Sequence, residues 1–124
     1  MDINWFNEKP KECVITLAQG NLTLNKAAAN YFEHAYSVML GIENKQKLVV
    51  IKPLNKAEAL KQDIPENRKY KITVRSSYAR ITNKAFVEEL VQMFGLTLGT
   101  EPLKFKASWN QKDQLMIVDM KEVL

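Results

Sequence analysis

The sequence predicts an α+β fold in which a strand-strand-helix-strand-strand unit occurs twice around a mainly antiparallel sheet or barrel. The first reason is a repeated phrase, since TLNKAA at residues 23–28 returns as ITNKAF at residues 81–86. The second reason is that the flanking segments keep the same order in both halves of the chain. The polar turns ENKQK and NQKDQ, for example, coincide when Leu48 is placed over Leu115.

The chain has 124 residues, which suits one compact domain. We expect a single domain over residues 1–124, with a first repeat at about 13–54, a linker at 55–69 and a second repeat at about 70–120. The hydrophobic share of 46% and the charged share of 26% are ordinary for a globular protein.

In the first repeat, residues 14–17 alternate as a strand does, with Ile15 and Leu17 on one face. The turn AQGN and the strand LTL follow, and Asn25 then stands where a helix N-cap belongs. We expect a helix over KAAANYFEHA, residues 26–35. A hairpin of SVMLGI and LVVIKPL completes the unit, and its second strand is expected to end at Pro53 because proline cannot donate to a ladder.

The second repeat follows the same order. Residues 72–74 and the strand ARIT flank the turn RSSY, and Asn83 is the expected N-cap of a helix over residues 84–94. Gly95 is the expected C-cap of that helix, which should cover one face of the sheet. The strands LKFKASW and QLMIVDM form the last hairpin.

Two segments lie outside the repeats. The charged stretch at residues 55–69 predicts a short helix over KAEALKQ followed by a surface linker. Near the start of the chain, Trp5 and Phe6 are expected to pack over an exposed face or groove of the folded body.

The residue inventory argues against catalysis. Cys13 is the only cysteine, so it forms no intramolecular disulfide, and its apolar surroundings favour the role of a small buried hydrophobe. His34, the only histidine, falls in the expected helix and is not predicted to activate Cys13. The glycines form no phosphate-binding loop, and no metal cluster is evident. We therefore expect neither catalytic residues, nor a metal, nor a cofactor.

The chain shows neither a signal-peptide pattern at its start nor a run long enough for a membrane span. The sequence favours a reducing cytoplasmic setting with no membrane partner.

The net charge of +4 favours anionic partners. Tyr78 lies in a turn with Arg75 and Arg80, a pattern found in nucleic-acid-binding proteins and also common on ordinary surfaces. Lys26 and Lys84 occupy equivalent positions after the two caps. If a pseudo-twofold axis relates the two units, these lysines could straddle a phosphate backbone, although each could equally be an exposed first-turn residue.

The stretch from QGNLTLNKAAANYF to YSVMLGIENKQKLVVIKPL resembles the AbrB/MraZ swapped-hairpin family over about residues 14–54, and more faintly over 72–119. The resemblance implies DNA binding and a homo-oligomer. Lys26 and Lys84 match the lysine of the family's strand phrase, whereas asparagines stand at its proline position and Asn21 and Ala79 at its arginine position. The pattern is similarly close to small uncharacterised bacterial proteins with ITLNKAA before a hairpin, and to TATA-binding-protein-like folds.

These observations favour a small cytoplasmic binding protein, with nucleic-acid binding or a regulatory role as the first hypothesis. The candidate contacts are Lys26, Lys84, Arg75 and Arg80. The second hypothesis is a protein-interaction or small-ligand-binding module, and a carboxylate-based enzyme ranks third. A homodimer or another protein is a further expected partner.

Overall fold

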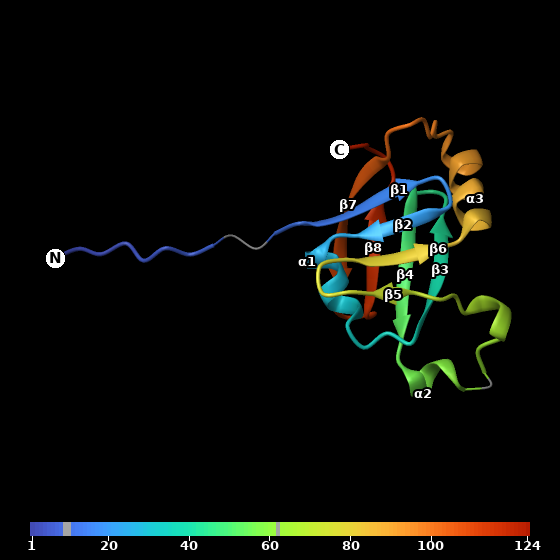
Figure 1. Cartoon of the computed structure of the whole chain (residues 1–124), viewed down its shortest axis with the longest axis horizontal. Helices are drawn as coiled ribbons and strands as arrows, with labels where there is room; N and C mark the ends of the chain where they lie inside the picture. The colour runs from blue at the N-terminus through green and yellow to red at the C-terminus, as the bar shows by residue number, and fades with distance from the viewer. Residues whose placement is uncertain (9–10, 62) are drawn as a thin grey trace.

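The computed structural model describes residues 1–8, 11–61 and 63–124, which form an eight-stranded sheet with short helices (Figure 1). The strands are β1 (Cys13–Ala18), β2 (Asn21–Leu24), β3 (Ser37–Glu43), β4 (Leu48–Leu54), β5 (Thr73–Val74), β6 (Ala79–Thr82), β7 (Leu103–Asn110) and β8 (Leu115–Asp119). The α-helices are α1 (Lys26–Ala29), α2 (Lys56–Ala59) and α3 (Lys84–Phe94), and the 3₁₀ turns are η1 (Asn30–Phe32) and η2 (Glu66–Arg68).

All pairings within the sheet are antiparallel, and the strand order is β3-β4-β8-β7-β1-β2-β6-β5. The sheet curls into a half-barrel, and Tyr70, three residues before the edge strand β5, forms an isolated bridge with the other edge strand, β3. There Val38 and Tyr70 exchange backbone hydrogen bonds of 2.9 and 2.8 Å. The predicted α+β class with a mainly antiparallel sheet is confirmed.

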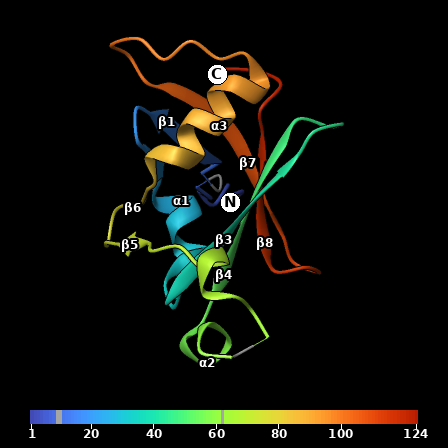
Figure 2. The ribbon, with the colours of Figure 1, turned by 90° about the vertical axis from the view of Figure 1, so that its right-hand side faces the viewer.

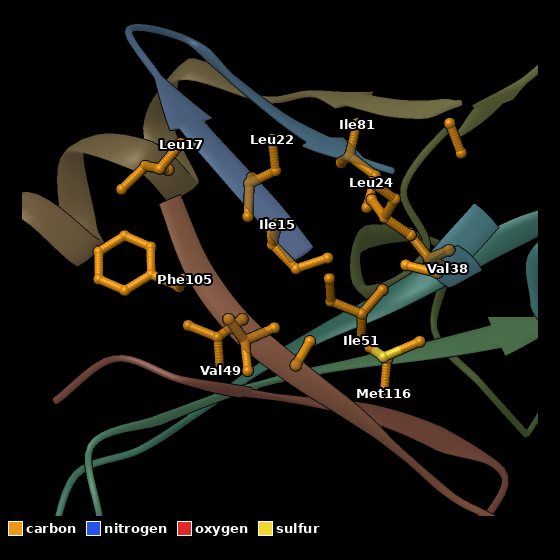
Figure 3. Close-up of a cluster of buried hydrophobic side chains, with 14 of the residues drawn as sticks. Ile15, Leu17, Leu22, Leu24, Val38, Val49, Ile51, Ile81, Phe105 and Met116 are labelled. Atoms are coloured by element: carbon orange, nitrogen blue, oxygen red, sulfur yellow. The ribbon is translucent and has the colours of Figure 1, made fainter. Parts of the chain in front are cut away.

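The concave side of the sheet holds the core. On β1, Ile15 and Leu17 point inward and are 1% exposed, as the alternation predicted, and Phe105 of β7 joins them. Figure 3 shows the inward side chains meeting from both halves of the sheet: Ile15, Leu17, Leu22, Leu24, Val38, Val49, Ile51, Ile81, Phe105 and Met116. One cluster thus joins strands that are far apart along the chain, and burial of this apolar surface is the main force that stabilises the fold.

Asparagine begins each of the three α-helices. The Oδ1 atoms of Asn25 and Asn83 accept hydrogen bonds from the third residues of α1 and α3, at 3.1 and 3.0 Å. Asn55 does the same for α2, and Glu58 completes a capping box. NKA is therefore a helix-start signal that occurs three times, once outside the two predicted repeats.

Helix α3 has the predicted bounds, and Gly95 ends it in the left-handed conformation with a φ of 62°. The predicted helix over residues 26–35 is too long. The α-helix ends at Ala29, the chain tightens into η1, and His34 lies in the following turn. The reason is that Phe32, which is 0% exposed, must point into the core. This tertiary requirement overrides the local helical preference.

Two further expectations are wrong. Trp5 and Phe6 do not pack on the body, since they are 81% and 87% exposed in a segment that extends away from it (Figure 1). β4 does not end at Pro53 but continues to Leu54. Pro53 is tolerated because its partner Val38 directs its backbone N–H and C=O to Tyr70, and because the pairing of β4 with β8 ends at Ile51, so no donor is needed at residue 53. The expected short helix at KAEALKQ is present as α2, and Gln62 lies outside the described residues.

Asn25 does more than cap a helix, and this leads to a stability prediction. Its Oδ1 also accepts from the Val14 amide at 3.1 Å, and its Nδ2 donates to the Glu12 carbonyl at 2.8 Å, so it ties α1 to β1. We expect Asn25→Ala to lower the free energy of unfolding by about 2 kcal/mol, and Asn83→Ala, which breaks one such bond, by about 1 kcal/mol. Urea denaturation measures both values, and a larger loss in Asn83→Ala would contradict this account.

Candidate nucleic-acid interface

The convex side of the sheet carries polar side chains over β7, β1, β2, β6 and β5. On β6, buried Ala79 and Ile81 alternate with exposed Arg80 and Thr82. Strand register then aligns outward side chains across the five strands in one row, formed by Lys104, Thr16, Thr23, Arg80 and Thr73. Short hydroxyl side chains thus separate two cations in the middle of a curved surface.

Further cations flank this row. Lys106 lies two residues beyond Lys104 on β7, Arg75 follows β5, and Lys71 precedes it. Carboxylates border these cations on the β7 side. Glu12 forms an ion pair with Lys106 at 3.2 Å, and Asp119 of β8 follows Val118, the partner of Ala107. Glu122 lies in the segment whose Leu124 amide donates to the Lys104 carbonyl at 2.8 Å. We call this surface the basic face and define it by Lys71, Arg75, Arg80, Lys104 and Lys106.

Arg80 is held in place by two neighbours. Its Nε donates to the Thr23 hydroxyl at 3.2 Å, and its guanidinium carbon lies 5.0 Å from the centre of the Tyr78 ring. A cation over an aromatic ring is attracted by the negative face of the ring. Arg75 is close by, because its amide donates to the Tyr78 carbonyl at 2.8 Å across the β5–β6 turn. The structure therefore brings Arg75, Tyr78 and Arg80 together.

Lys26 and Lys84 are exposed but separate from each other. Lys26 follows the end of β2, where Leu24 pairs with Ala79, whereas Lys84 follows the other end of the β2–β6 pair, where Asn21 pairs with Thr82. The two strands are antiparallel, so the helices leave from opposite ends. The two lysines therefore lie beyond opposite ends of the β2–β6 pair, at the starts of α1 and α3.

The contribution of β7 was missed from the sequence. Lys104 and Lys106 join the basic face only because β7 pairs with β1, at Lys104–Thr16 and Lys106–Val14. The alternation in LKFKAS predicts that both lysines share the outward side of a strand. It does not predict which strand lies beside them.

The remaining candidates show no catalytic arrangement. Burial raises the pKa of the Cys13 thiol, which disfavours the reactive thiolate. His34 lines a surface hollow of about 330 Å³ together with Lys52 and Glu58, and Cys13 is not in its lining. Among the described residues, no group of three His, Cys, Asp or Glu side chains could hold a metal ion.

In the described part of the chain, no helix has the length and apolar character needed to cross a membrane. Comparisons of the chain with protein-family models, with curated proteins and with solved structures find no match.

Proposed function

We propose that this protein binds nucleic acid through the basic face and catalyses no reaction. The observation that carries the proposal is the gathering of Lys71, Arg75, Arg80, Lys104 and Lys106 on one convex surface, where Glu12 and Asp119 lie at the Lys106 end and Arg75 and Arg80 lie at the other. Cations that are not neutralised by nearby carboxylates attract phosphates and release counterions when they bind them.

The dimensions of the basic face suit an extended phosphate backbone. Lys104 and Arg80 are separated by three strand spacings along the row, which corresponds to roughly 14 Å at about 4.8 Å a strand. The threonine hydroxyls between them can donate to phosphate oxygens. Tyr78 adds a partly exposed ring on which a base can stack.

We also infer that the two halves of the chain are related by duplication, as the sequence predicts. When Asn25 is aligned on Asn83, Asn21 corresponds to Ala79 and Leu24 corresponds to Thr82. The pair Asn21–Thr82 therefore corresponds to the pair Ala79–Leu24, and both pairs are present in the β2–β6 ladder. The β4–β8 register supports the same inference. When Leu48 is aligned on Leu115, Val49 corresponds to Met116 and Ile51 corresponds to Val118. The pair Val49–Val118 therefore corresponds to the pair Met116–Ile51, and both pairs are present in the β4–β8 ladder.

The hairpin turns agree with the inferred duplication. Lys47 and Gln114, the residues before β4 and β8, both have positive φ, of 55° and 54°. A duplication would place Lys26 and Lys84 symmetrically about the β2–β6 pair, as outer contacts for a longer ligand.

The test is fluorescence anisotropy with labelled single-stranded and duplex oligonucleotides at two salt concentrations. If four phosphate contacts form, raising salt from about 50 to about 200 mM should weaken binding roughly 50-fold for a single strand and roughly 150-fold for a duplex. Lys104→Ala should reduce the slope of log affinity against log salt concentration by the amount that about one phosphate contact contributes. Lys112→Ala, in the β7–β8 turn, should leave this slope unchanged. Absence of binding to either oligonucleotide at low salt would refute the proposal.

A further inference from the structure

β4 and β8 do not alternate between apolar and polar residues. Their centres are Leu-Val-Val-Ile at 48–51 and Leu-Met-Ile-Val at 115–118. Val49, Ile51, Met116 and Val118 point inward and are buried, so their neighbours place aliphatic side chains on the outer side. Continuous apolar runs are typical of strands that are covered on both faces.

Strand pairing makes these outward side chains neighbours. Val50 lies beside Ile117, and Gly41 of β3 lies on the other side of Val50. We call this surface the apolar face, and it consists of Met39, Gly41, Leu48, Val50, Leu115 and Ile117, all partly exposed. In Figure 2, α1 and α3 lie on the concave side of the sheet, and none of the described elements covers the outer side of β4 and β8.

The two outer faces of this one sheet therefore differ in chemistry. The corresponding outward positions of β1, β2 and β6 include Thr16, Thr23 and Arg80, which suit contact with water. Contiguous exposed aliphatic side chains rimmed by polar ones mark an interaction surface. The apolar face has such a rim, because Glu43 and Asp119 lie at one end and Lys52 lies toward the other.

We propose that the apolar face binds the same face of a second copy of this chain. A twofold axis that runs between the two copies, above Val50 and Ile117 and perpendicular to the strands, would exchange the ends of the face. Lys52 of one copy would then oppose Glu43 and Asp119 of the other, so the surface is complementary to itself in charge as well as in apolar character. Lys52 is already oriented at its end, since its ammonium donates to the Asp113 carbonyl at 2.9 Å.

The size of the face predicts weak association. Three strands of about five residues form a flat surface of roughly 14 by 17 Å, which is smaller than the 800 Å² or so that each partner buries in a standard interface. The product is about 240 Å², less than a third of that value. We therefore expect a dissociation constant of about 100 µM, at the weak end of specific association. The basic face begins on the neighbouring strand β7, where Ser108 pairs with Ile117, so Lys106 lies close to the apolar face. Arg80 lies on β6, four strands away from β8 in the sheet, and stays free in both copies.

Sedimentation equilibrium between about 1 and 200 µM tests the proposal. The wild-type chain should dimerise, and the double variant Val50→Lys with Ile117→Lys should raise the dissociation constant at least about 100-fold while the circular dichroism spectrum is retained. The matched control is Thr97→Lys with Thr100→Lys, which adds the same charges at exposed positions between α3 and β7 and should leave the dissociation constant unchanged. A wild-type chain that stays monomeric throughout, or a dimer that persists in the β4–β8 double variant, overturns the proposal.

Reversing the charges at the two ends of the apolar face distinguishes this packing from other possible interfaces. Lys52→Glu alone should weaken the dimer about tenfold, and adding Glu43→Lys and Asp119→Lys should restore it, because the opposed charges are then reversed together. Trp5→Ser with Phe6→Ser should have no effect. Loss of the dimer in this last variant would assign the contact to the exposed segment at residues 1–8 and overturn the face-to-face arrangement.

Discussion

Replacing Phe32 with alanine is expected to lower the free energy of unfolding by about 3–5 kcal/mol, the largest loss we predict for a single substitution. Phe32 is 0% exposed and lies in η1, directly after the single turn of α1. Its ring meets that of Trp109 edge to face, with centroids 6.2 Å apart. A helical segment this short is unstable alone, so α1 and η1 depend on the burial of Phe32, Ala28 and Ala29. Urea denaturation followed by circular dichroism measures the loss.

Tyr31 is the matched control for Phe32. It is the preceding residue, and its ring stacks on Trp109 at 4.7 Å, but it is 46% exposed. Tyr31→Ala should therefore cost no more than about 1.5 kcal/mol. Equal losses in the two variants would show that Phe32 does not act as a core residue that closes the half-barrel.

The second large effect concerns nucleic-acid affinity. Reversing two charges at the centre of the basic face, by Arg75→Glu with Arg80→Glu, should weaken oligonucleotide binding roughly 100-fold at about 100 mM salt. The two side chains share the β5–β6 hairpin with Tyr78, so the substitutions remove two phosphate contacts and add repulsion at one place. The unfolding midpoint should change little, because both arginines are exposed.

Lys26→Glu with Lys84→Glu makes the same change in net charge at the opposite ends of the β2–β6 pair. This variant should weaken binding only about tenfold, because each lysine lies beyond an end of the β2–β6 pair and outside the basic face. Anisotropy titrations of the two variants under the same conditions separate a local site from general attraction to a basic protein. Equal weakening would contradict a binding site centred on Arg80.

Local patterns predicted many elements correctly. The alternation of Ile15 and Leu17 with their neighbours identified the inward side of β1, and both helix ends at Asn83 and Gly95 were predicted from capping chemistry. These predictions succeeded because strand alternation and helix capping depend on residues that are adjacent in the sequence.

The failures have a common physical cause. The alanine-rich stretch after Asn25 has high helical propensity, but the helix stops at Ala29 because Phe32 has to reach the core. Trp5 and Phe6 were expected to pack over a face or groove of the body, yet they are exposed. In both cases tertiary contacts, or their absence, decided the outcome against the local preference.

The sequence by itself determined which residues form strands, that Ile15 and Leu17 share one face of β1, and that helices begin after Asn25 and Asn83. Only the tertiary structure decided that β7 lies beside β1 and β8 beside β4. Those pairings join Lys104 to the row of Arg80 and place Val50 next to Ile117, which creates the basic face and the apolar face. The reason is that periodicity acts between neighbouring residues, whereas strand order depends on how the whole apolar surface is buried at once.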